Sequence, residues 1–238
     1  MRDAAEDWRR FAAGAIPTKD ATPHLDGFLA SIQEAAPRQP LALLDVGCGT
    51  GRLGRRLYDR GFSVTGVDVN PDAIGMARGL VPDSAPAART LRFAEADFAA
   101  DRSPQIDGSP FDVVVCQLVI SIIGAPRQRG NLLRHVRDNL HRGGWLYLSA
   151  SGVSDTINAG YARLYAEDAP LTGERHSYFS RDAAGRILYM THHFTADELV
   201  ALLEASGFDN VTVNIAREAS SRRPDEAAEF LYVTCRRA

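Results

Sequence analysis

The sequence predicts an α/β fold built on a mostly parallel sheet with helices on both faces. Two observations lead to this prediction. From about residue 41 to residue 150, short apolar runs alternate with amphipathic segments, and the first apolar run leads through three alternating glycines into an amphipathic segment. The chain has 238 residues, of which 45% are hydrophobic and 24% charged, as expected for one α/β domain with a small lid.

The most informative segment is Leu43–Leu53, which reads as a buried strand, an acid at its tip, a glycine loop and a helix start. Leu53 and Leu57 share one face of that helix, and Gly61 is a stop signal. Glycine has no Cβ and tolerates positive φ, so the loop backbone can approach a ligand closely. Its N–H groups face whatever lies over the helix N-terminus. The loop is therefore expected to hold a nucleotide-like cofactor.

The remaining elements of the core follow in order. A helix is predicted over 21–35, behind an amino-terminal segment whose aromatic residues, Trp8 and Phe11, either cover the cofactor or only fix the amino end to the body. Asn70-Pro71-Asp72 is typical of a helix start. A further helix is predicted over 127–140.

Residues 151–194 are the least core-like part of the chain. A short helix is predicted over 155–167 and a β-hairpin over 176–194. Alternation gives each hairpin strand two faces. In the first strand His176, Tyr178 and Ser180 share a face, and in the second Tyr189, Thr191 and His193 are separated from Leu188, Met190 and His192. The register between the strands stays open, so which histidine shares a face with which tyrosine stays open too.

The carboxyl-terminal part returns to a regular pattern. Thr195–Glu198 is a capping box that opens a helix through Ala205. Strands are predicted over 211–215 and 230–235.

Acids at three strand ends distinguish between cofactors. Asp45 would repel a pyrophosphate but suits an ammonium group. Asp68 ends the second strand roughly 20 residues after the loop, where a ribose diol is held. Asp97 ends the third strand and is followed by the aromatic Phe98. One acid for an amino acid moiety, one for ribose and one near adenine fits S-adenosylmethionine (SAM) better than NAD.

On these motifs the chain resembles the class I (Rossmann-like) SAM-dependent methyltransferases of the small-molecule type. The match runs from about Leu41 to Ala150, with a family-like ending from Thr195 to Cys235. It rests on five motifs in the right order and spacing, which are Asp45–Gly51, Val67-Asp68, Ala96–Phe98, Phe111–Gln117 and Leu140–Leu146.

The resemblance implies a doubly wound sheet of seven strands, the last inserted antiparallel, with a small hairpin and helix lid after strand five. It divides the chain into an amino-terminal helical lid segment (1–40), a SAM-binding core (41–150), a substrate-lid insertion (151–194) and a carboxyl-terminal helix with the last two strands (195–238).

The resemblance also implies roles for single residues. Asp45 would order the glycine loop and contact the amino group of SAM, Asp68 would accept both ribose hydroxyls, and Asp97 would accept from the adenine amino group. The full set of expected cofactor-binding residues is Asp45, Gly47, Cys48, Gly49, Gly51, Asp68, Val69, Asp97, Phe98 and Gln117. No metal is expected.

Methyl transfer from SAM does not require a catalytic triad, because orientation alone can lower the barrier by about 7–11 kcal/mol. The exit of strand four, Cys116–Ser121, is mostly apolar and lacks the Asn/Asp-Pro-Pro-Tyr/Phe motif of methyltransferases acting on base amines or glutamine amides. This favours a small organic acceptor, methylated on O, N or C.

Histidines that follow strand five are the candidates for proton handling. We assign this role to His176 and His192, with His193 and Tyr178 as further candidates, whereas His135 and His141 are expected at the surface. The alternative is that the hairpin only covers the core. Substrate contacts are expected from the aromatic residues Trp8, Tyr161, Tyr165 and Tyr178.

Two other functions remain open, an NAD-dependent oxidoreductase using the literal G-x-G-x-x-G of the loop and a non-catalytic SAM-binding protein. The first lacks a Tyr-x-x-x-Lys pair. The net charge of -3 gives no general attraction to nucleic acid or to an anionic membrane, so the expected partner is a small-molecule methyl acceptor and neither nucleic acid nor a membrane. The three cysteines lack metal-like spacing and are expected to be free and buried. We expect a cytoplasmic, bacterial enzyme that is a monomer or a homodimer.

Overall fold

The computed structural model describes residues 4–15, 23–36, 39–84, 86, 88–220 and 225–238. Its centre is a seven-stranded sheet in the order β3-β2-β1-β4-β5-β9-β8. The strands are β1 (Ala42–Val46), β2 (Ser63–Asp68), β3 (Leu91–Glu95), β4 (Phe111–Gln117), β5 (Leu140–Ser151), β8 (Phe208–Ala219) and β9 (Ala227–Arg237). This order confirms the predicted doubly wound sheet.

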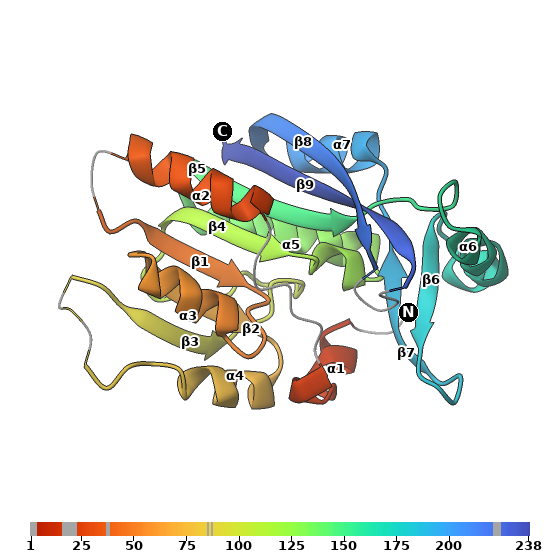
Figure 1. The fold of residues 1–238 in the computed structure, drawn as a ribbon, viewed down its shortest axis with the longest axis horizontal. Coiled ribbons are helices and arrows are strands. Elements are labelled where there is room, and N and C mark those ends of the chain that lie inside the picture. Colours follow the sequence, from red (N-terminus) through yellow and green to blue (C-terminus); the bar gives the residue numbers. More distant parts are fainter. Residues whose placement is uncertain (1–3, 16–22, 37–38, 85, 87, 221–224) are drawn as a thin grey trace.

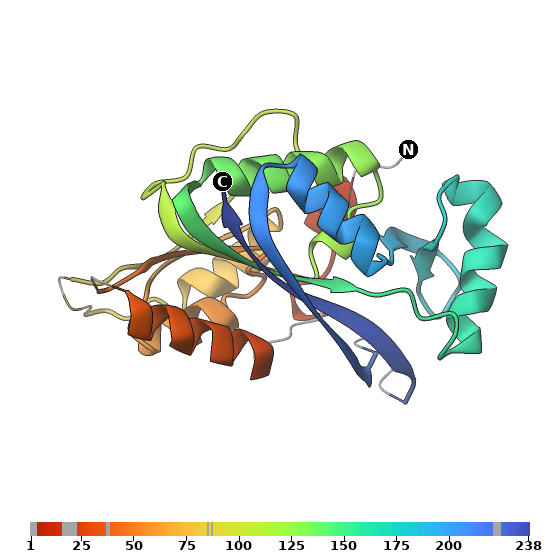
Figure 2. The same cartoon turned by 90° about the horizontal axis from the view of Figure 1, so that it is seen from above.

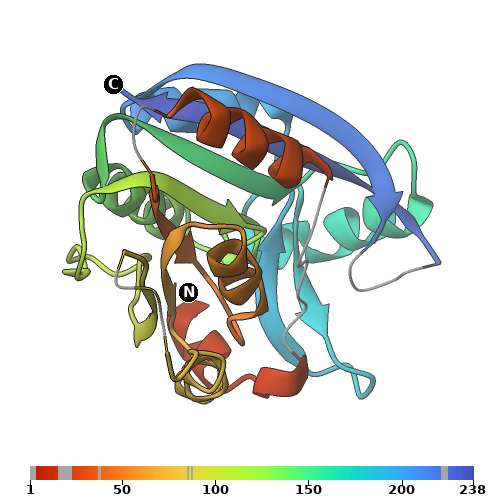
Figure 3. The same cartoon turned by 60° about the vertical axis from the view of Figure 1, so that its left-hand side comes forward.

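All but one of these strands run in the same direction. β9 lies between β5 and β8 and is antiparallel to both, as predicted. β8 and β9 are much longer than the predicted 211–215 and 230–235, and they form an arched hairpin that extends beyond the rest of the sheet (Figure 3).

Helices cover both faces of the sheet (Figures 1 and 2). One face carries α2 (Pro23–Ala35), α3 (Arg52–Asp59) and α4 (Pro71–Arg78), and the other carries α5 (Pro126–Asp138) and α7 (Ala196–Ala205). Successive side chains of β4 point to opposite faces of the sheet. Val113 and Val115 pack with α2 and α3, whereas Val114 and Cys116 pack with α5 and α7. The first two residues of the predicted helix 21–35 lie outside the described residues.

A second, two-stranded sheet follows β5. Its strands are the hairpin β6 (Ser177–Arg181) and β7 (Ile187–His192). With α6 (Ala159–Thr172) the hairpin forms an insertion beside the carboxyl ends of the parallel strands (Figure 1). α6 begins later than predicted, because Ser154–Asn158 forms a turn whose last side chain caps the helix by accepting from the Gly160 N–H at 2.8 Å. The short helices are α1 (Ala4–Arg9), η1 (Ala13–Ala15) and η2 (Ile120–Ile122).

Some side chains in the caps and the core differ from expectation. Thr195 caps α7 by accepting from the Glu198 N–H, but the Glu198 carboxylate binds Nε2 of His192 at 3.0 Å, so only half of the predicted capping box forms. The expectation that His135 lies at the surface is wrong, since it is 1% exposed. His141 is exposed, as predicted.

The three cysteines, Cys48, Cys116 and Cys235, are free and buried, as predicted. Within the described part of the chain, every helix is too short or too polar to cross a membrane.

Candidate functional site

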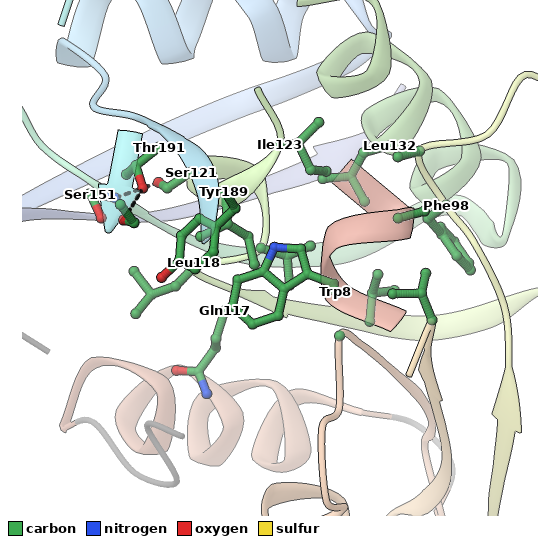
Figure 4. A pocket seen from close by; sticks show the side chains of 18 of the residues that line it. Trp8, Phe98, Gln117, Leu118, Ser121, Ile123, Leu132, Ser151, Tyr189 and Thr191 are labelled. Carbon is green, nitrogen blue, oxygen red and sulfur yellow. Dashed lines mark hydrogen bonds between the residues drawn. The ribbon is translucent and has the colours of Figure 1, made fainter. Parts of the chain in front are cut away.

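One pocket opens at the carboxyl ends of β1, β2 and β4. α1 lies across it, and the insertion formed by α6, β6 and β7 bounds its far side (Figures 1 and 4). Six of the predicted cofactor residues line it, namely Gly47, Asp68, Val69, Asp97, Phe98 and Gln117, and so do the predicted aromatic residues Trp8, Tyr161 and Tyr178. Asp45 is not in the lining but directly precedes the lining residues Val46 and Gly47 at the end of β1. The same pocket therefore touches both the glycine-loop side and the lid side.

The glycine loop is shaped by close packing. The N–H groups of Gly47 and Cys48 both donate to the Val67 carbonyl, at 2.8 and 3.0 Å, which binds the loop to β2. Gly51 precedes α3 with φ +79°, and a Cβ there would lie 2.7 Å from Cβ of Ala77 and 2.9 Å from the Phe93 ring. Only glycine fits this position. Cys48, Gly49 and Gly51 do not line the pocket but form the turn that presents Gly47 to it.

Asp45 is a buried acid behind the loop. It is 2% exposed, and among the described residues its Oδ2 has no hydrogen-bond partner. Burial, and secondarily the neighbouring Asp68 carboxylate, raise the pKa of Asp45 to about 7. A buried carboxyl group with an unsatisfied oxygen is suited to a cationic ligand, whose charge would favour its ionised form.

Asp68 connects the glycine loop to the start of α4. Its Oδ2 accepts from the Gly49 N–H at 2.8 Å, and its Oδ1 accepts from the Asn70 N–H at 2.9 Å. Burial raises the pKa of Asp68, although backbone N–H donors act in the opposite direction. Each carboxylate oxygen can accept more than one hydrogen bond, so Asp68 can also accept from a ligand in the pocket that it lines.

Asp97 and Phe98 lie on a loop that α5 holds in place. Oδ1 of Asp97 accepts from the N–H groups of Ala99 and Ala100, so this acid does cap its own loop while it lines the pocket. Nδ1 of His135 lies 3.0 Å from the Phe98 carbonyl oxygen. Because a carbonyl can only accept, Nδ1 is the donor in this hydrogen bond. Asn131 donates to the carbonyls of Ala99 and Ala100 at 3.1 and 3.0 Å. The sequence does not predict these roles of His135 and Asn131, because each residue lies on a helix more than 30 residues away from the loop that it holds.

α1 places an aromatic side chain in the pocket. The Trp8 indole lies there with Gln117, Leu118 and Tyr189 around it (Figure 4). Its ring centroid is 4.6 Å from that of Tyr189 in β7 and 4.9 Å from that of Phe11. Within the described part of the chain, Nε1 of Trp8 is buried without a hydrogen-bond partner. This segment both covers the pocket and fixes the amino end.

The hairpin register answers the question that alternation left open. Tyr178 pairs with Thr191, and Ser180 pairs with Tyr189. The face that carries Tyr178 and Ser180 in β6 and Tyr189 and Thr191 in β7, followed by His193, lines the pocket. The structure therefore unites His193, and not His192, with the tyrosines.

His193 is surrounded by hydroxyl groups. It is 2% exposed, and its Nδ1 lies 2.6 Å from Oη of Tyr165 while its Nε2 lies 3.5 Å from Oη of Tyr178. The Tyr161 ring packs at 4.9 Å, and its hydroxyl lies 3.0 Å from Oγ of Ser220. Tyr165 is behind His193 and does not line the pocket.

The histidines predicted to be catalytic lie outside the pocket lining. His176 packs against the Tyr165 ring at 5.5 Å. His192 is on the opposite face of the hairpin, where Nδ1 lies 2.8 Å from Oγ of Ser177 and Nε2 lies 3.0 Å from Oε1 of Glu198.

His192 belongs to a buried polar network between the insertion and the core. Glu174 lies 3.5 Å from its Nδ1 and forms an ion pair with Arg129 of α5, which is 3% exposed. Glu174, His192 and Glu198 are close enough together to share a metal ion, but the Arg129 guanidinium already binds the Glu174 carboxylate. The network is better described as an anchor that joins the hairpin to α5 and α7.

The charge of the pocket lining is low. Among the described lining residues, the acidic and basic side chains are those of Asp68, Asp97 and His193. Both acids are at the glycine-loop side, whereas the lid side offers aromatic rings and hydroxyl groups.

Known proteins of the same fold and family are similar to this chain. A family model described as a methyltransferase domain matches residues 24–213. A solved structure of a SAM-dependent methyltransferase from Methanosarcina mazei is 26% identical with a TM-score of 0.74, covering 92% of this chain and 99% of that one.

Two curated relatives are similar over part of their length. The ribosomal RNA small subunit methyltransferase H of Chelativorans is 30% identical over 70% of this chain and 47% of its own. The ubiquinone biosynthesis O-methyltransferase of Caulobacter vibrioides is 32% identical over 56% of this chain and 49% of its own. The chain thus spans about half the length of these relatives.

Proposed function

Because the chain belongs to the SAM-dependent methyltransferases, we propose that it transfers the methyl group of SAM to an oxygen, nitrogen or carbon atom of a small organic molecule held beneath α1. The observation that carries this proposal is the continuity of the pocket, which touches Asp68 and Asp97 on one side and Tyr161, Tyr178 and His193 on the other. SAM supplies a methyl group on a positively charged sulfur. The chain supplies orientation and the exclusion of water.

The residues at the glycine-loop side fit SAM. In this proposal the unsatisfied Oδ2 of Asp45 attracts the ammonium group, directly or through water, and Asp68 accepts from the ribose hydroxyls. Asp97 and Phe98 hold the adenine, Val69 packs against it, and Gln117 lies near the methionine part. Cys48, Gly49 and Gly51 act by shaping the loop.

On the acceptor side, the proposal uses Trp8, Tyr161 and Tyr178 as contacts and Tyr165 as a support behind His193. A ribosomal RNA acceptor, as named for one relative, is not favoured. Among the described residues, the lid side of the pocket is lined by aromatic and hydroxyl side chains and not by the lysines and arginines that bind phosphate. A cytoplasmic location is part of the proposal and rests on the three free cysteines.

Titration calorimetry with SAM, S-adenosylhomocysteine (SAH) and NADH tests the cofactor half. We expect micromolar binding of SAM and SAH and no binding of NADH. Asp68→Ala should abolish SAM binding with the fold retained, whereas Asp72→Asn, at an exposed position in the first turn of α4, should not change it.

Mass spectrometry tests the acceptor half. Small organic acceptors incubated with SAM should give products that are heavier than the acceptor by about 14 mass units, the mass of one CH₂ group. Methylation of ribosomal RNA alone, with no small molecule methylated, would overturn the proposal.

A further inference from the structure

We propose that the acceptor is a hydroxyarene, uncharged apart from its reacting hydroxyl, and that Nε2 of His193, oriented by Tyr165, accepts the proton of that hydroxyl. This inference rests on the proposed function and specifies its acceptor side. It moves the proton acceptor from His176, which precedes β6, and from His192, which lies on the opposite face of the hairpin, to His193 on the pocket face.

The first support is the position of His193. It is the histidine that the hairpin register places on the pocket face, directly after β7. Its two nitrogens face different surroundings. Nδ1 is directed to Tyr165, which lies behind the pocket lining, and Nε2 is on the side of Tyr178, which belongs to the lining.

The second support is the hydrogen bonding of Tyr165. Its Oη accepts from the Ser154 N–H at 3.4 Å and lies 2.6 Å from Nδ1 of His193. A hydroxyl oxygen has two lone pairs, so it can also accept from a protonated Nδ1. That tautomer leaves the lone pair of the imidazole on Nε2, at the pocket side, as a base requires.

Tyr165 suits this orienting role because it stays neutral. Burial raises the pKa of Tyr165. A neutral hydroxyl can accept from the imidazole before and after Nε2 is protonated, as the third group of a catalytic triad does with its carboxylate. Tyr165 is therefore a positioning residue and His193 a catalytic one.

The third support is the chemistry of the lid side. Rings of Trp8, Tyr189, Tyr161 and Tyr178 line it, and such faces favour a flat aromatic ligand. No lysine or arginine is among the described lining residues, so a carboxylate or phosphate carried by the acceptor would be buried without a counter-ion. The acceptor is therefore expected to be neutral outside its hydroxyl.

The transfer step is balanced. As the acceptor oxygen forms its bond to the methyl carbon, its proton passes to Nε2 of His193. The electron pair of the broken sulfur–carbon bond stays on sulfur, which becomes a neutral thioether. The positive charge thus moves from sulfur to the imidazolium, which later loses its proton to solvent.

The experiment uses the full chain and three probes, 2-naphthol, the more acidic 1-nitro-2-naphthol and the carboxylated 6-hydroxy-2-naphthoate. His193→Gln removes the base, Tyr165→Phe removes the orienting hydroxyl, and His141→Gln is the matched control at an exposed position. Calorimetry with the SAH complex measures binding without turnover, and rates at saturating SAM measure kcat and KM from pH 5.5 to 9.

His193→Gln should lower kcat for 2-naphthol by about 100-fold or more, with binding to the SAH complex changed much less. The loss should shrink to a few-fold for 1-nitro-2-naphthol, which is ionised without a base. Tyr165→Phe should shift the pH profile for 2-naphthol and leave that for 1-nitro-2-naphthol unchanged. The titratable groups near His193 include Tyr161, Tyr165 and Tyr178, with His176, Asp155 and Glu229 beside Tyr165. A profile unchanged in His193→Gln would exclude His193 as its source.

The carboxylated probe should bind the SAH complex roughly tenfold or more weakly than 2-naphthol, because its charge would be buried unpaired. Equal binding of the two would overturn the neutral-acceptor assignment. Wild-type rates in His193→Gln would overturn the base assignment and leave the proposed function standing. If SAM and SAH bind but neither naphthol binds or reacts, the hydroxyarene class is wrong, whereas absence of SAM binding would instead overturn the proposed function.

Discussion

Asn70 donates from Nδ2 to the Trp8 carbonyl at 2.9 Å, across 62 positions of the sequence. The same nitrogen donates to the Phe11 carbonyl at 2.8 Å, while Oδ1 accepts from the Ala73 N–H at 2.9 Å. One buried side chain thus caps α4 and holds α1 over the pocket. The sequence predicts the capping role of Asn70, but the second role depends on a segment that packs from far along the chain.

Asn70→Ser should keep the cap and release α1, because serine caps helices well but lacks the amide donors. The carbonyls of Trp8 and Phe11 would each lose the hydrogen bond from Asn70, at a cost of about 1–3 kcal/mol per bond, and the Trp8 carbonyl would keep the Phe11 N–H at 3.2 Å. Hydrogen exchange over residues 4–11 should therefore accelerate, and the KM for the acceptor should rise. The control is Asn214→Ser, on the exposed surface of β8. Unchanged exchange in Asn70→Ser would mean that aromatic packing alone holds α1.

SAM binding should depend on pH through Asp45. Because the pKa of Asp45 is raised to about 7 in the free protein, the carboxyl group is largely protonated at pH 6. The ammonium group of SAM would favour the ionised form, so binding should release a proton. The affinity should rise with pH by up to about tenfold per unit below pH 7 and then level off. Calorimetry in buffers of different ionisation enthalpy measures the proton release, and an equal release in Asp45→Asn would assign it to another group.

The glycine loop offers a paired test of backbone strain. Gly51→Ala would force a Cβ against Ala77 and Phe93 at positive φ, and we expect a destabilisation of about 1–3 kcal/mol together with loss of SAM binding. Gly75→Ala, in α4 with open space around its Cβ, should stabilise the protein by about 0.4–1 kcal/mol. Thermal unfolding measures both. Equal effects of the two variants would contradict the packing around Gly51.

His135 should contribute to SAM affinity through Phe98. Burial lowers the pKa of His135, so the ring is neutral at pH 7 and can donate from Nδ1 to the Phe98 carbonyl. His135→Leu removes the donor, and we expect SAM affinity to fall about tenfold, as for one lost hydrogen bond. His135→Asn places an amide donor near the position of Nδ1 and should restore part of it. Calorimetry measures the SAM affinity of both variants. Equal losses of affinity in the two would indicate general destabilisation and not the loss of the hydrogen bond to Phe98.

Breaking the buried network should affect stability more than cofactor binding. Glu174→Gln would leave the Arg129 guanidinium without its carboxylate, and removing one partner of a buried ion pair costs about 3–5 kcal/mol. The melting temperature should fall, while SAM affinity at a temperature where the protein stays folded should not change. Arg186→Gln, which removes an exposed ion pair with Asp182, should have little effect.

The sequence predicts the core well because its signals are local. Leu43–Leu53 indicates a strand, a turn and a helix start within eleven neighbouring positions. The helix cap at Asn70 can be predicted from Asn70 and the three residues that follow it. The predicted strands 211–215 and 230–235 are shorter than β8 and β9 because Phe208 is the one buried residue of β8 and the ends of β9 are alanines and arginines, not an apolar run.

The acceptor side was harder to predict because its geometry is non-local. Alternation separates His192 from His193, but only the pairing of Tyr178 with Thr191 decides which of them meets the tyrosines. The burial of His135 likewise depends on a carbonyl at Phe98, which no helical periodicity reports.

The two faces of the β6–β7 ribbon have separate duties. One face, with Ser177 and His192, attaches the ribbon to the helices behind it, and the other presents Tyr178, Ser180, Tyr189 and Thr191 to the pocket. If the proposed function holds, side chains on the pocket face can therefore vary with the acceptor while those that hold the ribbon stay constant. The pocket face of the ribbon can therefore be exchanged independently of its attachment face. A library of substitutions confined to the pocket face should alter selectivity without unfolding the enzyme.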